Sequence, residues 1–168
     1  MGNTSRPKGL KPQNAGTARC RKYFITAAQV LSDGDVVSLD SAGTLVIGAG
    51  LPVGVVNGGM IDGTTGGIKA TAEAGDYCFV WDDPATVFIA QITSFAATDP
   101  YTTRSSAACY DIAGDTGVQY IDAGSHAQDA MKIIGLEYEE NGVKSVVGAY
   151  AKVECRFNLL KHVYGVIA

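Results

Sequence analysis

The chain has 168 residues, of which 46% are hydrophobic and 18% are charged, and its formal net charge is −4. A chain of this length and composition forms one globular domain with its own core, so the composition excludes a disordered protein. The sequence has no apolar stretch approaching the ~20 residues of a membrane helix, and it begins without the apolar segment of a signal peptide. We therefore expect a protein that is made in the cytoplasm and binds no membrane.

Positive charge gathers at the N-terminal end. Residues 1–32 hold six basic and no acidic residues, whereas the remaining chain holds seven basic and seventeen acidic ones, so a charge of +6 precedes one of −10. We predict an extended arm over residues 1–20, ordered by a neighbouring subunit, and a single β-rich body over residues 21–168. Because the body is acidic and no aromatic residue precedes Tyr23, we expect the arm to contact an acidic protein surface and not a nucleic acid. The candidate partner-binding residues are Arg6, Lys8, Lys11, Arg19, Arg21 and Lys22.

The first part of the body has the pattern of short strands joined by turns. Aromatic and β-branched residues are frequent in it, and these residue types favour strands. Turns are predicted at Asp33-Gly34, Ala42-Gly43 and Asn57-Gly58. The predicted strands lie in residues 21–28, in residues 32–48 as a pair, in residues 51–59 and around residues 68–72.

Two apolar runs flank an Asp-Asp-Pro step in the middle of the chain. Residues 77–81 and 86–93 predict two strands. Pro84 fixes its own φ and favours extended backbone at Asp83, and Asp82 is of the residue type that caps backbone amides at turns. Adjacent carboxylates can also bind a metal or transfer a proton, but the sequence places no histidine motif or further ligands beside them. We therefore interpret Asp82, Asp83 and Pro84 as a structural turn.

The last part of the chain also favours strands. Residues 96–130 are polar and rich in small residues, and residues 103–112 offer at most a helical turn or two. Residues 129–166 predict three strands, the first two joined by a hairpin turn at Glu140-Asn141-Gly142. No long segment has the 3.6-residue apolar period of a helix, and no internal repeat is recognisable. The sequence thus predicts a mainly β fold, a small β-barrel or β-sandwich with an extended N-terminal arm and little helix.

No motif points to catalysis. Gly48-Ala49-Gly50 lacks the spacing of a dinucleotide-binding loop, and residues 62–67 lack the acidic ligands of a calcium loop. His126 and His162 stand outside any recognisable motif. We therefore expect a protein that is not an enzyme and that uses no cofactor and no metal ion.

The four cysteines are widely spaced. Cys20, Cys78, Cys109 and Cys155 form no Cys-x-x-Cys pair, which argues against a zinc site. We predict that all four thiols are free, and that Cys78 and Cys155 are buried because they lie in apolar, strand-like runs.

A family resemblance rests on five segments and their order along the chain. They are Arg6-Pro7-Lys8-Gly9, Arg21-Lys22-Tyr23, PVGVV (52–56), WDDPATVFIAQ (81–91) and GAYAKVECRFN (148–158). The chain resembles a family of virion structural proteins of tailed DNA bacteriophages, especially short-tailed and marine ones; residues 60–73 and 96–130 depart from it. The resemblance implies a capsid decoration (cement) protein on the virion surface. Such a protein binds the outside of the major capsid protein shell as a homo-oligomer, a dimer or trimer, and stabilises it.

Two other classes of function remain open from the sequence. Another virion structural component or a host-adhesion module, such as a head fibre or tail part, would present an exposed aromatic patch, for which Trp81 and Tyr101 are the candidates. A small β-barrel enzyme or ligand carrier would instead contain a deep pocket with convergent polar groups.

Overall fold

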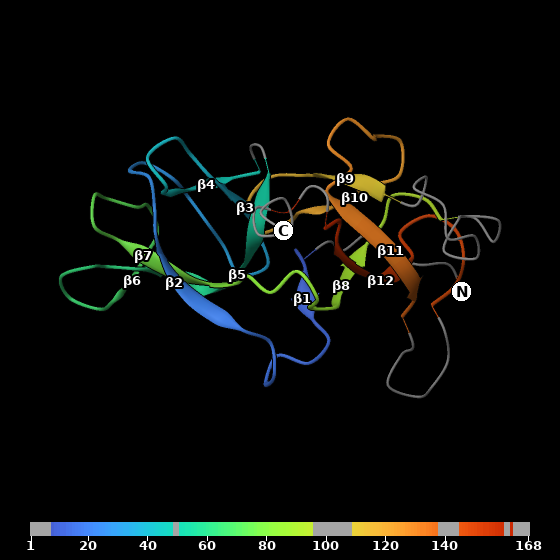
Figure 1. Cartoon of the computed structure of the whole chain (residues 1–168), viewed down its shortest axis with the longest axis horizontal. Coiled ribbons are helices and arrows are strands. Elements are labelled where there is room, and N and C mark those ends of the chain that lie inside the picture. Colours follow the sequence, from blue (N-terminus) through green and yellow to red (C-terminus); the bar gives the residue numbers. More distant parts are fainter. Residues whose placement is uncertain (1–7, 49–50, 96–108, 138–144, 160–161, 163–168) are drawn as a thin grey trace.

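Every regular element that the structure describes is a β-strand, and the strands form two antiparallel sheets that pack together (Figure 1). The predicted mainly β fold is confirmed in its sandwich form, since neither sheet closes into a continuous barrel. Among the described residues, no helix has the length and apolar character needed to cross a membrane. The computed structural model describes residues 8–48, 51–95, 109–137, 145–159 and 162.

Each sheet is built almost wholly from one half of the chain, and the halves lie side by side in Figure 1. The first sheet contains β2 (Cys20–Phe24), β3 (Val36–Leu39), β4 (Leu45–Ile47), β5 (Pro52–Ile61), β6 (Ile68–Lys69) and β7 (Tyr77–Trp81). Its strand order is β2-β7-β5-β3-β4, with β6 paired to β5. The second sheet contains β1 (Lys11–Pro12), β8 (Phe88–Gln91), β9 (Cys109–Ala113), β10 (Tyr120–Asp122), β11 (Met131–Leu136) and β12 (Lys152–Phe157). Its strand order is β1-β8-β12-β11-β9-β10.

Apart from β1 and β6, the two sheets have the same topology. The strands β2, β3, β4, β5 and β7 correspond in chain order to β8, β9, β10, β11 and β12, and they occupy the same places in the two strand orders. In each sheet one parallel bridge joins the end of the first strand to the third strand. The bridge connects Ile25 to Leu45 in the first sheet and Ile92 to Ile121 in the second.

The ladder registers of the two sheets also agree. Val56 opposes Val80 in the first sheet, and Ile133 opposes Cys155 at the equivalent place in the second. A register shift follows shortly after this pair in both sheets. The chain is therefore a tandem repeat of one five-stranded unit, which the sequence did not reveal, because the equivalent residues share apolar character more than identity. We call residues 20–81 the N-terminal unit and residues 88–157 the C-terminal unit.

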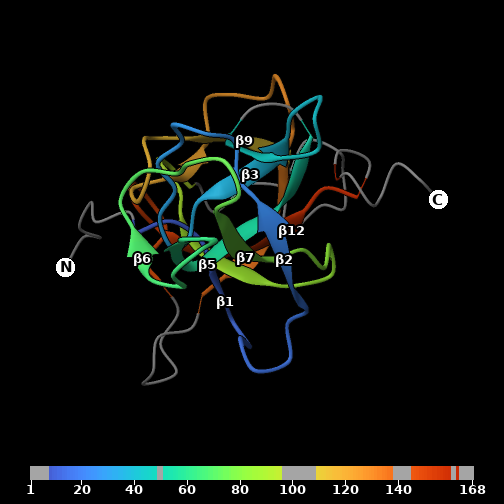
Figure 2. The same ribbon diagram turned by 90° about the vertical axis from the view of Figure 1, so that its left-hand side faces the viewer.

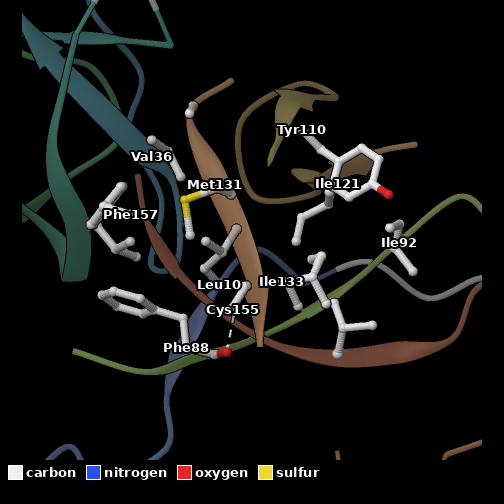
Figure 3. Packing of buried hydrophobic residues seen from close by; sticks show 14 of the residues in the cluster. Leu10, Val36, Phe88, Ile92, Tyr110, Ile121, Met131, Ile133, Cys155 and Phe157 are labelled. Carbon is white, nitrogen blue, oxygen red and sulfur yellow. Dashed lines mark hydrogen bonds between the residues drawn. The ribbon is translucent and has the colours of Figure 1, made fainter. Parts of the chain in front are cut away.

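The units have separate cores that meet at the first sheet. Val37 and Val56 belong to the core of the N-terminal unit, whereas their neighbours Val36 and Val55 belong to the larger core of the C-terminal unit. Successive side chains of a strand point to opposite faces, so the first sheet is buried on both faces here. Figure 3 shows Val36 within the same cluster as Met131.

The segment of residues 8–13 fastens the two units together. The side chain of Leu10 is fully buried in the core of the C-terminal unit, while its N–H donates to the carbonyl of Gly34 at 2.8 Å. Gly9 has a φ of +71° and lies so close to Gly34 that a Cβ on it would be 2.5 Å from the Gly34 oxygen, so only glycine fits there. The two residues that follow Leu10 form β1, which pairs with β8. Over residues 8–13, the predicted arm therefore lies on its own body.

Three strand predictions need correction. β5 continues through Asn57-Gly58, where a shift of register replaces the predicted turn. β9 occupies the end of residues 103–112, where a helical turn was expected, because Cys109 and Tyr110 are buried in a sheet. Residues 145–151 form no strand, so two of the three strands predicted after residue 128 are found, and the predicted Glu140–Gly142 hairpin lies outside the described residues.

The prediction for the cysteines is confirmed. All four are free, and Cys78 and Cys155 are buried. Cys109 is buried as well, whereas Cys20 is exposed. Burial raises the pKa of Cys78 to about 12 and also raises the pKa values of Cys109 and Cys155, so these three thiols pack as small apolar groups.

Shortening the buried side chain of the fastening segment tests its structural role. Leu10→Ala leaves a cavity in the core of the C-terminal unit, and we expect it to lower the free energy of unfolding by about 2–5 kcal/mol in urea denaturation. Leu159→Ala removes the same atoms from a side chain that is 49% exposed and should change stability by less than about 0.5 kcal/mol. Equal losses in the two variants would show that residues 8–13 are not part of the core.

Candidate interaction surface

A buried carboxylate, that of Asp82, joins the start of β2 to the end of β7. Its side chain has no solvent exposure. Arg19 Nε donates to Oδ1 at 2.7 Å, Tyr23 Oη donates to Oδ2 at 2.8 Å, and Arg21 Nε lies 3.5 Å from Oδ2. The hydrogen bond to Asp82 raises the pKa of Arg19. A charge buried in this way is stable only with its cations in place, so Asp82 fixes the conformation of the chain around β2.

The turn between the two units is built by the residues after Asp82. The side chain of Asp83 accepts a hydrogen bond from Ala85 N at 2.9 Å, and its carbonyl accepts one from Thr86 N at 3.0 Å. Pro84 lies within this turn. Asp83 and Pro84 thus form a structural turn, as predicted. Asp82 instead binds arginine side chains and does not cap backbone amides with its carboxylate.

The predicted partner-binding residues that the structure describes have different surroundings. Lys11 forms an ion pair with Asp33, and both arginines, Arg19 and Arg21, bind Asp82. Three of the predicted partner-binding residues are therefore held by acidic groups of their own chain. Lys8 is exposed beside a shallow groove next to β1.

Lys22 differs from these residues because it lies over aromatic rings. Its Nζ is 3.7 Å from the centre of the Tyr77 ring and 5.2 Å from that of the Phe24 ring. A cation over a ring face is attracted by the ring quadrupole while it stays in contact with water. The remaining predicted residue, Arg6, lies outside the described residues.

Large hydrophobic side chains surround Lys22 on the outer side of the first sheet. Ile68 is 77% exposed, Phe24 54% and Phe79 39%, and the Tyr77 and Phe79 rings meet edge to face at 5.9 Å. The register places Phe24 opposite Tyr77 and Lys22 opposite Phe79. Ile61 of β5 lies between Tyr77 and Ile68, because it opposes both, so Ile68 belongs to the same row as Phe24 and Tyr77. Contiguous apolar exposure of this kind marks an interaction site. We call Lys22, Phe24, Ile68, Tyr77 and Phe79 the aromatic face; Figure 2 views the molecule from the side of β2, β6 and β7.

The sequence contains one signal for this surface. Residues 77–81 are apolar at every position, so the strand can bury only one of its two sets of side chains in its own unit. The two aromatic residues considered for an exposed patch do not form it. Trp81 is only 6% exposed, in the core that the two sheets share, and Tyr101 lies outside the described residues.

The loop that carries Ile68 is held by a second carboxylate, that of Asp76. It accepts hydrogen bonds from Glu73 N at 2.8 Å and from Gly63 N at 2.9 Å, and it lies 3.0 Å from Lys69 Nζ. These contacts lower the pKa of Asp76 to about 2. The hydrogen bonds from the two backbone N–H groups contribute most, and the lysine contributes less. The position of Ile68 on the aromatic face therefore depends on an ionised carboxylate.

His162 has a structural role. His162 is buried, with Nε2 3.0 Å from the carbonyl oxygen of Val53 and its ring 4.9 Å from that of Phe157, and burial lowers its pKa. In the part of the chain that the structure describes, no group of three or more His, Cys, Asp or Glu residues could hold a metal ion.

Comparison of the chain with protein-family models, with curated proteins and with solved structures gave no match. The function is therefore argued from the sequence and the surface. Among the described residues, the aromatic face combines exposed apolar side chains with a cation, and Val146, Val147 and Tyr150 are further exposed hydrophobic residues in the C-terminal unit.

Neutral substitution of the two adjacent aspartates separates their roles. Asp82→Asn keeps the side-chain volume but removes the charge that Arg19 and Arg21 share, and we expect a loss of about 1.5–3 kcal/mol in the free energy of unfolding. Asp83→Asn retains an acceptor for Ala85 N and should cost less than about 0.5 kcal/mol. If urea denaturation gives the two variants the same stability, the buried ion cluster is not what fixes β2.

The Asp76 carboxylate predicts a specific dependence of stability on pH. Its pKa is about 2 in the folded protein against an ordinary value of 3.8, so its stabilisation is complete above pH 4 and is lost as the pH falls through 2. Asp76→Asn should therefore be less stable than wild type at pH 5, and the difference should shrink towards pH 2. Thermal unfolding of both proteins over this range provides the measurement, and a difference that stays constant with pH would contradict the assignment.

Proposed function

We propose that this protein is a capsid decoration protein of a tailed bacteriophage, which binds the outer surface of the major capsid protein shell and stabilises it. The observation that supports the proposal most directly is the aromatic face, an exposed apolar surface on a sheet whose other side is packed. The resemblance of five chain segments to virion structural proteins supports the choice of partner.

A decoration protein needs a body that transmits force between its contacts. The two units are joined by direct hydrogen bonds as well as by residues 8–13. Val36 N donates to the side-chain oxygen of Gln119 at 2.6 Å, and Gly117 N donates to the carboxylate of Asp35 at 2.7 Å. These bonds connect the start of β3, and Asp35 just before it, to the loop between β9 and β10 of the other unit. They oppose movement of one unit against the other.

The aromatic face lies at one end of this body. In Figure 1 the strands β2, β6 and β7 lie at the left, and β9, β10 and β11 lie at the right. In a protein attached to the shell through the aromatic face, β9, β10 and β11 would lie at the far end of the molecule from that contact. This geometry suits attachment to a surface and leaves the second unit for contact with neighbouring copies.

Affinity at this surface would come mainly from apolar burial. Complete burial of one large apolar side chain contributes about 1.5–3 kcal/mol. Association of two proteins costs about 4–15 kcal/mol in lost freedom, so Phe24, Ile68 and Phe79 alone support only weak binding. Copies that act together, as a dimer or trimer on a shell with many equivalent positions, raise the overall affinity without new contacts. We therefore propose that the protein acts as a homo-oligomer on the virion.

Polar substitution on the aromatic face tests this function. The double variant Phe24→Ser/Phe79→Ser should bind purified capsid shells at least about tenfold more weakly than wild type, because these side chains form the centre of the contact. Val118→Ser provides the control, since Val118 is 45% exposed in the C-terminal unit. Co-sedimentation with shells gives the affinities, and thermal unfolding verifies that each variant is folded.

Two outcomes would contradict the proposal. Unchanged binding of the double variant would remove the aromatic face as the docking surface. Absence of shell binding by wild type, together with binding to host cell surfaces that the double variant loses, would instead favour a host-adhesion module.

A further inference from the structure

A groove of about 620 Å³ lies where the two units meet. One wall comes from the segment between β2 and β3 and from the end of β4, and the other comes from the end of β9 and the loop that follows it. Ligand sites are common at such junctions. We call this hollow the junction groove; β4 and β9 lie on the upper side of the molecule in Figure 1. Its lining includes Gln29, Val30, Ile47, Ile112, Asp115 and Gln119.

A buried amide, that of Gln119, directs hydrogen-bond donors into the junction groove. Gln119 is only 2% exposed, and its side-chain oxygen accepts a hydrogen bond from Val36 N at 2.6 Å. Its Nε2 faces Gly48, another lining residue, where an added Cβ would lie 3.9 Å from it. Among the described residues, no group pairs with Nε2. Because a buried donor without a partner is costly, Gln119 is suited to bind an acceptor that a ligand supplies.

The end of β4 offers an acceptor to the same groove. Gly48 N donates to the carbonyl of Val36 at 3.1 Å, so Gly48 bonds to β3. Hydrogen bonding alternates along an antiparallel strand, so the N–H and C=O of Ile47 point to the other side. The N–H of Ile47 donates to the side-chain oxygen of Gln29 at 3.3 Å, and none of the described groups pairs with its C=O. The groove thus holds a donor and an acceptor for a peptide group of a ligand.

The rest of the lining is apolar and acidic. Val30 is 44% exposed, and Ile47 and Ile112 are partly buried. Asp115 is exposed, and the buried carboxylate of Asp35, which holds the loop after Asp115, adds a second negative charge. The lining contains no basic and no aromatic side chain. These features disfavour a phosphate or carboxylate ligand, and they disfavour a nucleobase, which needs a ring to stack on.

A lysine residue has all the complementary groups. Its four-carbon stem is apolar and its tip is cationic, and such a side chain buries the stem while the charge stays in water. The stem would lie along Val30 and Ile47, the ammonium group would reach the carboxylate of Asp115, and the carbonyl of the lysine would accept from Gln119. All these contacts come from one residue, so they require no particular pattern in the segment around it.

We propose that the junction groove binds a lysine residue of the partner protein. This inference deepens the proposed function, on which its choice of partner rests. Val30 and Ile47 belong to the N-terminal unit, whereas Asp115 and Gln119 belong to the C-terminal unit, so a lysine held here contacts both units. Its binding would oppose separation of the units and would add a second contact with the shell to that of the aromatic face.

Short peptides test the inference without capsid shells. The probe is a blocked Gly-Ala-Lys-Ala-Gly peptide, and two control peptides have norleucine or glutamate in place of lysine. Norleucine keeps the stem and removes the charge, and an exposed ion pair contributes little. We therefore expect the lysine peptide to bind wild type about three- to fivefold more tightly than the norleucine peptide, and at least about tenfold more tightly than the glutamate peptide. Titrations followed by amide chemical shifts give the affinities, and the shift changes should centre on residues 28–30, 47–48 and 112–119.

Two matched pairs of variants separate the contacts. Asp115→Asn should lower the affinity for the lysine peptide to that for the norleucine peptide. Asp83→Asn makes the same change in net charge outside the groove and should leave the preference for lysine unchanged. Val30→Ser should weaken the binding of the lysine and norleucine peptides alike, whereas Val118→Ser, at a side chain of nearly equal exposure that does not line the groove, should not.

The side-chain amide of Gln119 provides a separate readout. A peptide carbonyl that accepts from Nε2 should shift the side-chain amide signals of Gln119 more than those of Gln13 and Gln128, which lie outside the groove. This shift reports the contact directly and does not depend on the affinity of any variant.

Four results would overturn the inference. They are equal affinities for the lysine and norleucine peptides, an unchanged preference in Asp115→Asn, unshifted side-chain signals of Gln119, and shifts of groove residues that depend on protein concentration without peptide, which would make a second copy the occupant. Failure of the proposed function is distinguishable. A protein that binds the lysine peptide as expected but does not bind shells keeps its lysine site and loses the capsid as its partner.

Discussion

Burial of the Asp82 carboxylate is the constraint from which the arrangement of the N-terminal unit follows. An ionised group without access to water requires cations, and Arg19, Arg21 and Tyr23 supply the contacts. These contacts hold β2 beside β7 and commit two of the basic residues near the N-terminus to the chain's own fold. Lys22, the next basic residue, is left on the outer side of the sheet, where it lies over Tyr77.

The second constraint is that two copies of one unit share a single chain. Residues 8–13 precede the first copy but pair with the second, so they cover the edge of β8, whereas no strand in the described part of the chain pairs with the equivalent edge of β2. The copies are alike in topology and register, yet among the described residues it is the N-terminal unit whose outer sheet face exposes Phe24 and Phe79. This difference between otherwise equivalent units is what directs our functional argument to one end of the molecule.

Local patterns in the sequence were sufficient for part of the fold. The strands at residues 36–39, 45–47 and 77–81 were predictable because turn residues and β-branched or aromatic residues mark them. The repeat was not predictable, because Val56 and Val80 are replaced by Ile133 and Cys155 at equivalent places. What the two units share is a register of hydrogen bonds, which leaves little trace in residue identity.

The site was less predictable than the fold, because burial depends on partners distant in the chain. An isolated Leu10 in a polar segment carries no periodic signal, although it is fully buried. Charge alone suggested that Arg19 and Arg21 bind another molecule, whereas Asp82 binds them. Phe24 and Phe79 have the residue type of core positions, and only the packing of the sheet shows that they face outward.

Hydroxyl-radical footprinting of the protein on capsid shells tests the central claim most directly, because it measures side-chain exposure in the assembled state. Our account predicts that oxidation of Phe24, Tyr77 and Phe79 falls sharply on binding. Oxidation of Tyr150, which is 40% exposed in the C-terminal unit, should fall much less. Protection of Tyr150 with continued oxidation of Phe24 and Phe79 would contradict the account, because it would place the docking surface on the other unit.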